Sequence, residues 1–156
     1  MNSQYLPKNS YLQRSLLLSI ITNIIFLLSA CGDSNDFPDR QFEGYIDLTN
    51  PSFSQKNIFI VRRDSYGNYL GINGVVVYKQ GNQYYAFDIM CPYEKKETCS
   101  IEIDSDEETI VTCKCCGSTF LVASPDGDLI SGPAPHGLKK YNTKVVQNTL
   151  IINSTY

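Results

Sequence analysis

The sequence is poor in the residues on which many active sites depend. It has a single histidine, His136, no tryptophan, and 13 lysines and arginines against 16 aspartates and glutamates. The cations form no basic stripe, so we predict no nucleic-acid partner, because phosphate neutralisation requires one. A lone histidine without a paired carboxylate provides no acid–base constellation, and no G-x-S-x-G, P-loop or dinucleotide fingerprint is present. These absences argue against a substrate-converting enzyme.

The N-terminal residues predict an export signal. Lys8 and Arg14 supply positive charge, residues 16–28 are largely apolar, and the segment ends in Leu28-Ser29-Ala30-Cys31. The apolar stretch is too short for a comfortable membrane span and ends in small residues, as a cleavable signal does. The final tetrapeptide resembles the lipobox of bacterial lipoproteins, which implies that Cys31 is acylated and becomes the mature N-terminus. The alternative is an uncleaved membrane anchor.

Either alternative places the folded part outside the cytoplasm and attaches it to a membrane, through an N-terminal lipid if Cys31 is acylated. We therefore expect the bacterial cell envelope, with the protein facing the periplasm or lying on the cell surface. The predicted organisation is a signal peptide at residues 1–30, an acidic tether at residues 31–42 and one domain at residues 43–156. The length of the last segment is typical of a single domain.

Short β-strand patterns dominate the predicted domain, and no long stretch has helical periodicity. The clearest pair, residues 74–79 and 83–88, is rich in β-branched and aromatic residues and is joined by a turn at Gln80-Gly81-Asn82. Further strands are expected at residues 57–62, 108–112, 119–122, 128–130, 144–146 and 149–152. Many short strands separated by turn residues predict an all-β fold, either an antiparallel sandwich or a small barrel.

The cysteine count limits how the chain can be cross-linked. Of six cysteines, five remain once Cys31 is set aside, namely Cys91, Cys99, Cys113, Cys115 and Cys116. Disulfides are the first expectation in an exported protein. An odd number leaves at least one cysteine unpaired or bound to another group. Because adjacent cysteines rarely bond to each other, we expect Cys115 and Cys116 to have different partners.

Most of these cysteines fall in recognisable segments, Cys91-Pro92-Tyr93 and Cys113–Phe120, and Gly132-Pro133-Ala134-Pro135 follows them. Together they resemble the Rieske iron–sulfur domain, whose two boxes read C-x-H and C-x-x-H-G-S-x-F before a G-P-A-P stretch. The resemblance covers roughly residues 45–153 and implies a Rieske-like fold with a cysteine-bearing two-loop subdomain. Tyr93 and Cys116 stand where the family has its histidine ligands.

The resemblance implies a [2Fe-2S] cluster with an altered ligand set. Cys91 and Cys113 match the two thiolate ligands of one iron, while Tyr93 and Cys116 occupy the ligand positions of the other. Cys116 could replace an imidazole by a thiolate, whereas a phenol that titrates near pH 10 is a poor substitute. Loss of the imidazoles lowers the expected reduction potential and removes imidazole-linked proton transfer. The implied activity is one-electron transfer with a redox protein or a small quinone-like carrier.

The resemblance also implies roles for residues outside the ligand set. Gly117 and Ser118 match the G-S of the second box, where the serine donates a hydrogen bond to a cluster sulfur and tunes its potential. Cys115 matches a cysteine that forms a disulfide with the first loop in many respiratory Rieske domains, which implies a Cys99–Cys115 pair. The segment between Cys91 and Cys99 is longer and more charged than the family pattern.

Three other arrangements of the cysteines stay open. The domain could be a metal-free scaffold with two disulfides, serving as a binding or structural module at the cell surface. Alternatively, Cys91, Cys99, Cys113 and Cys116 could form an all-thiolate zinc site. The Cys113-x-x-Cys116 spacing also permits a redox-active dithiol. For His136 we expect solvent exposure or a local hydrogen bond, with recruitment as a replacement ligand as the alternative.

Overall fold

Strands make up nearly all of the regular structure in the computed structural model, which describes Arg14, Ser19 and residues 37–154. In chain order the elements are β1 (Glu43–Asp47), the short helix α2 (Pro51–Ser54), β2 (Ile58–Val61), β3 (Val75–Gln80), β4 (Gln83–Asp88), β5 (Ile101–Ile103), β6 (Ile110–Cys113), β7 (Thr119–Leu121), β8 (Asp128–Ser131), β9 (Lys140–Val146) and β10 (Thr149–Asn153). No helix among the described residues is long and apolar enough to cross a membrane. The predicted lipidation site, Cys31, and most of the predicted signal peptide lie outside the described residues.

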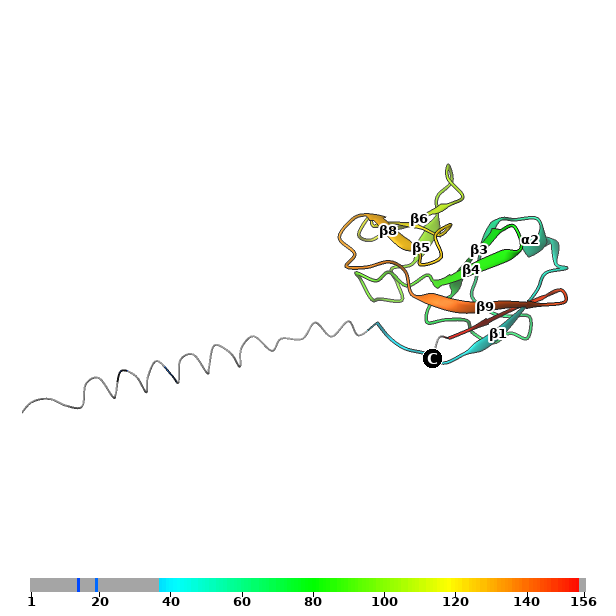
Figure 1. The fold of residues 1–156 in the computed structure, drawn as a ribbon, viewed down its shortest axis with the longest axis horizontal. Helices are drawn as coiled ribbons and strands as arrows, with labels where there is room; N and C mark the ends of the chain where they lie inside the picture. Colours follow the sequence, from blue (N-terminus) through cyan, green and yellow to red (C-terminus); the bar gives the residue numbers. More distant parts are fainter. Residues whose placement is uncertain (1–13, 15–18, 20–36, 155–156) are drawn as a thin grey trace, which may run out of the picture. The chain divides into compact units, whose positions relative to one another are not determined.

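The strands form two antiparallel sheets, which confirms the predicted all-β class. The larger sheet has six strands in the order β1-β10-β9-β4-β3-β2, and the smaller has four in the order β5-β6-β7-β8. Figure 1 shows the smaller sheet, drawn in yellow-green to orange, beside the larger one. Within the larger sheet, β4 and β9 are joined only through the pairs Ala86–Tyr141 and Phe87–Lys140, so it consists of two three-stranded halves.

The β3–β4 hairpin is the centre of the fold, and the sequence predicts it well. Gly81 takes a left-handed φ of 61° in the connecting turn, a conformation that glycine adopts without steric cost. Val75, Val76 and Val77 are all fully buried, because both faces of β3 are covered. Side chains of a strand alternate between its faces, so Val75 and Val77 enter one hydrophobic cluster and Val76 enters another.

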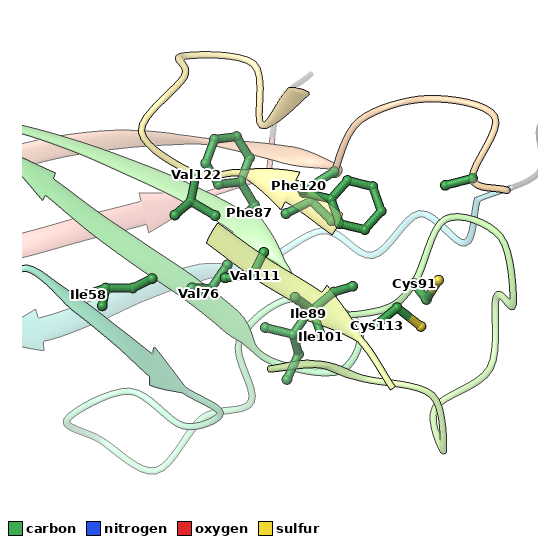
Figure 2. Packing of buried hydrophobic residues seen from close by; sticks show 12 residues of the cluster. Ile58, Val76, Phe87, Ile89, Cys91, Ile101, Val111, Cys113, Phe120 and Val122 are labelled. Atoms are coloured by element: carbon green, nitrogen blue, oxygen red, sulfur yellow. The ribbon is translucent and has the colours of Figure 1, made fainter. Parts of the chain in front are cut away.

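These clusters divide the core between the two sheets. The first cluster, here called the scaffold core, lies within the larger sheet and is formed by Ile46, Phe59, Val61, Leu70, Val75, Val77, Ala86, Tyr141, Leu150 and Ile152. The second, here called the shared core, joins β2–β4 to the smaller sheet and is formed by Ile58, Val76, Phe87, Ile89, Cys91, Ile101, Val111, Cys113, Phe120, Val122, Ala134 and Leu138. Figure 2 shows Cys91 and Cys113 together at one end of the shared core. Hydrophobic packing therefore reaches the cysteines directly.

The structure contains three elements that the sequence did not predict. Strand β1 has an exposed acidic residue at each end, and β5 has only three residues, so neither shows a clear strand pattern. Helix α2 spans a single turn, with Asn50 as its N-cap and Pro51 in its first turn, a known start signal. None of these elements contributes a cysteine to the loops described below.

Candidate metal centre between two cysteine loops

The first cysteine loop, residues 91–99, follows β4. Pairing of Met90 with Ser100 closes its base, and the Ile101 N–H donates to the Ile89 carbonyl at 2.7 Å. At its ends, the Cys91 N–H donates to the Cys99 carbonyl at 3.3 Å. The longer, charged segment that departs from the Rieske pattern thus lies between positions that are hydrogen-bonded to each other, so its extra length does not separate the two ends of the loop.

The second cysteine loop joins β6 to β7 and is a tight turn. The Cys113 N–H donates to the Ser118 carbonyl, and the Gly117 N–H donates to the Cys113 carbonyl, both at 2.8 Å. Gly117 has a φ of 73°, which favours glycine at this position of the turn. These bonds hold Cys115 and Cys116 at the tip, directly after the buried end of β6.

A disulfide joins the two loops. It links Cys99 to Cys115, with Cα atoms 5.7 Å apart, and it confirms the pairing that the resemblance implied. Because Cys99 is oxidised, the zinc site formed by Cys91, Cys99, Cys113 and Cys116 is wrong. Cys91, Cys113 and Cys116 are free thiols, so the described residues contain one disulfide where the metal-free alternative expected two.

The three free thiols converge on one point. Cys91, Cys113 and Cys116 bring their sulfur atoms within 4.8 Å of one another, and the Cys91 and Cys116 sulfurs are 3.5 Å apart. Cys91 and Cys113 are fully buried, whereas Cys116 is partly exposed. Two of the thiols are therefore shielded from water, and the third lies on the solvent side of the group.

The pKa values of two of these thiols are shifted in opposite directions. Burial, together with contacts to Cys113 and Cys116, raises the pKa of Cys91 to about 12. The backbone N–H groups of Glu94 and Tyr93 act in the opposite direction and offset part of these effects. Partial burial alone would raise the pKa of Cys116. Hydrogen bonds from the side chain and backbone of Ser118, and from the other two thiols, outweigh this effect, so the pKa of Cys116 is lowered. Cys116 is thus the better preformed thiolate of the two.

Ser118 supports Cys116 from a fully buried position. The Cys116 thiol donates to Ser118 Oγ at 3.2 Å, and the same hydroxyl can donate in return once Cys116 is ionised. Ser118 Oγ also accepts from the Ala134 N–H at 3.1 Å, which ties it to the Gly132–Pro135 segment. A Cβ at Gly132 would lie 2.4 Å from the Ser118 Cα. The glycine therefore permits this segment to close over Ser118.

Asp88, which the sequence suggests only as the end of a strand, fixes the start of the first cysteine loop. Its buried carboxylate accepts from the Ile72 N–H and the Tyr141 hydroxyl through Oδ2, both at 2.6 Å, and from the Met90 N–H through Oδ1 at 2.7 Å. Burial, followed by the charge of Asp88, raises the pKa of Tyr141 well above its usual range. The sequence offered one signal for this role, which is that an acidic residue ends an apolar strand three residues before Cys91.

The two remaining candidate ligands lie differently. Tyr93 is 52% exposed, although its backbone N–H lies at the Cys91 sulfur. His136 Nδ1 lies 2.8 Å from the Gly137 carbonyl oxygen, as expected for a local hydrogen bond. The group of convergent ligand atoms among the described residues contains only the three cysteines and does not include His136.

Comparison with known proteins assigns the family. A model of the Rieske [2Fe-2S] domain matches residues 53–142, more than half of the chain. The chain therefore belongs to the Rieske [2Fe-2S] domain family. It is also similar to the crystal structure of the cyanobacterial plasma membrane Rieske protein PetC3 from Synechocystis PCC 6803, with 20% identity, 66% of this chain and 92% of that chain covered, and a TM-score of 0.46. No curated protein matches the sequence.

The donor set fits the family's cluster in part. Three soft sulfur ligands lie between the two loops, and thiolates are the usual protein ligands of iron–sulfur clusters. Neither position that holds an imidazole in the family offers one here, since those positions are Tyr93 and Cys116. Sulfur thus replaces nitrogen at one position, and the described residues provide no comparable donor at the other.

Proposed function

We propose that the protein is a one-electron carrier of the bacterial cell envelope with a [2Fe-2S] cluster in a thiolate-rich ligand set. Cys91 and Cys113 would hold one iron, Cys116 the other, and Tyr93 or an atom from outside the chain would complete the set. The observation that carries the proposal is the convergence of three free thiols between two loops that a disulfide already joins. The cluster would supply the redox chemistry.

The surrounding residues are suited to hold such a centre rather than to transform a substrate. Cys91 and Cys113 exclude water because they lie within the shared core. Ser118 and the backbone N–H groups near Cys91 provide hydrogen bonds that favour thiolate over thiol. With sulfur in place of imidazole, we expect a potential nearer to roughly −400 mV than to the approximate range of −150 to +300 mV of Rieske centres. The potential should also vary little with pH, since no ligand imidazole would titrate.

The cellular setting in this proposal rests on the N-terminal sequence. Acylation of Cys31 would tether the domain to a membrane, and the residues between Cys31 and Asp39, which pairs with Lys139 of the domain, would form its linker. A membrane-attached redox protein or a quinone-like carrier would then be the electron partner. Labelling with a radioactive fatty acid should mark the full-length protein and not Cys31→Ser, and both should fractionate outside the cytoplasm. Labelling of Cys31→Ser to the same extent would refute acylation at this residue.

Electron paramagnetic resonance of the reduced protein, purified anaerobically from a host that assembles clusters, tests the redox proposal. A signal with the integrated intensity of one reduced cluster per chain is expected, and Cys113→Ser should abolish both the signal and the visible colour. Cys99→Ser, which leaves all three free thiols in place, should retain colour and mainly lower thermal stability. A colourless, iron-free wild-type protein under these conditions would refute the proposal.

The second candidate is a metal-free module whose loops bind a protein or glycan at the cell surface. The absence of both ligand imidazoles favours it, as does the 3.5 Å separation of the Cys91 and Cys116 sulfurs, which already places two thiols in contact. In this case the domain should keep the same melting temperature whether or not iron and sulfide are supplied during its expression. A clear rise in melting temperature on cluster assembly would contradict this candidate.

A further inference from the structure

The spacing of the three free sulfurs matches a single metal ion. Thiolates that share one ion at a metal–sulfur distance of about 2.3 Å lie roughly 3.8–4.0 Å from one another. The Cys91 and Cys116 sulfurs are 3.5 Å apart, and no pair in the group exceeds 4.8 Å. Changes of about 1 Å or less in the separations between the sulfurs would bring all three to one ion.

A binuclear cluster makes a different demand on the same side chains. Ligands on two irons are separated by the bridging sulfides, so Cys116 would have to lie farther from Cys91 than it does here. Cys91 and Cys113 are held in the shared core and have little room to withdraw, whereas Cys116 is partly exposed at the loop tip. Cluster loading therefore requires a larger outward movement of Cys116 than the binding of one ion does.

The number of donors narrows the choice of ion. Structural zinc is almost always four-coordinate. Among the described residues, the convergent group consists of three cysteine sulfurs, and no histidine, aspartate or glutamate belongs to it. Cu⁺ is a softer ion, for which thiolate ligands are selective, and it is satisfied by fewer ligands than Zn²⁺. Three thiolates without a fourth protein donor are thus better suited to Cu⁺.

We propose that Cys91, Cys113 and Cys116 form a mononuclear, three-thiolate site that binds one Cu⁺ ion when no cluster is present. The ion enters from the side of Cys116, the only one of the three that is partly exposed. The three thiol protons pass to solvent as the sulfurs bind, and the oxidation state of copper does not change. The Cys99–Cys115 disulfide keeps the loops together and remains outside the coordination. This inference does not depend on the proposed cluster, although both use the same thiols.

Anaerobic titration of the metal-free mature protein with Cu⁺, against a colorimetric Cu⁺ chelator, tests the site. We expect one equivalent to bind, a sulfur-to-copper charge-transfer band to appear, and X-ray absorption to show a single shell of three sulfurs. Zn²⁺ should not displace the bound ion. Binding of two or more copper ions, or a shell with fewer sulfurs, would overturn the inference.

The variants are chosen to separate loss of a ligand from loss of the fold. Cys116→Ser, at the exposed side, should fold and weaken Cu⁺ binding by more than the roughly 10–100-fold expected for loss of a supporting hydrogen bond. Lys114→Ala is the matched control, because it changes the same loop at an exposed salt bridge to Glu102 and should leave affinity unchanged. Equal affinity of Cys116→Ser and the wild type would exclude this ligand set.

A last arm distinguishes this site from the proposed redox centre. Loading with one equivalent of Cu⁺ should prevent later assembly of a cluster from iron and sulfide, because the two centres compete for the same sulfurs. A protein that assembles the cluster but binds no Cu⁺ would overturn the copper site and leave the redox proposal intact. A protein that binds one Cu⁺ through three sulfurs but never assembles a cluster would support the copper site and refute the redox proposal.

Discussion

The scaffold core and the cysteine loops are stabilised in different ways. The scaffold core is filled by aliphatic and aromatic side chains, and it contains no cysteine. The loops lie between β4 and β5 and between β6 and β7, and they combine packing with a disulfide, backbone hydrogen bonds and a buried serine. The comparison suggests why ligand residues can change without loss of the fold. The scaffold core contains none of them, whereas Cys91 and Cys113 belong to the shared core and Cys116 packs against it.

The two regions are nevertheless connected through the same strands. In β3, Val75 and Val77 face the scaffold core while Val76 faces the shared core. In β4, Ala86 and Phe87 divide in the same way, and Asp88 then anchors the loop that carries Cys91. A change on one face of this hairpin should therefore disturb the thiols, whereas a change on the other should not.

The largest expected effect comes from removing a side chain of either core. Phe87→Ala should lower the free energy of unfolding by about 3–5 kcal/mol and Leu150→Ala by about 2–5 kcal/mol, because each leaves a buried cavity. Denaturant unfolding measures both changes. Only Phe87→Ala, in the shared core, should also alter the reactivity of Cys116 toward alkylation in the folded state. If Leu150→Ala changes that reactivity equally, the two cores are not separable.

Removal of the disulfide should have the next largest effect. Replacing both Cys99 and Cys115 by serine opens a loop with a sequence separation of 16 residues, which is worth about 3 kcal/mol in the chain-entropy model. Thermal unfolding of the double variant and of the reduced wild type should show the same loss. A double variant as stable as the oxidised wild type would mean that packing alone holds the loops.

Asp88→Asn tests the link between β4 and the first loop. The carboxylate accepts all three of its hydrogen bonds. The NH₂ group of an asparagine is itself a donor and would face one of these three donors, so that hydrogen bond would be lost. Loss of a hydrogen bond to a buried charge should cost about 1.5–3 kcal/mol, measured by denaturant unfolding. Asp126→Asn is the control, because its salt bridge to Lys140 is exposed and is worth about 0–1 kcal/mol. Equal effects of the two changes would contradict a special role for Asp88.

The smallest expected effect distinguishes the thiols by pH. In the metal-free protein with its disulfide intact, alkylation of Cys116 should reach half its maximal rate below the pH of an ordinary thiol, because its lowered pKa gives more thiolate at any given pH. Cys91 should stay unmodified over the same pH range, because it is fully buried and its pKa is raised. Mass spectrometry of the labelled peptides measures both. Ser118→Ala should move the Cys116 profile back toward higher pH, and an unchanged profile would remove Ser118 from this role.

The sequence predicts the fold where the pattern is local. The strands around the turn at Gly81 follow from their β-branched and aromatic residues and from the glycine, whereas three-residue β5 depends on pairing with β6 and has no pattern of its own. The Cys99–Cys115 pair followed from the family resemblance, since the cysteine count alone allowed several pairings. The contact between Cys91 and Cys116, which are 25 residues apart, and the three bonds to Asp88 arise only from the tertiary fold.

The most direct test of the thiolate-rich centre is the iron, copper, zinc and acid-labile sulfide content of the mature protein. It should be purified anaerobically from a host that assembles clusters. The account predicts iron and sulfide at about two each per chain, as a [2Fe-2S] cluster requires, and their loss in Cys113→Ser. Neither iron nor sulfide, with three thiols free to react in the wild type, would contradict it and leave a metal-free Rieske scaffold.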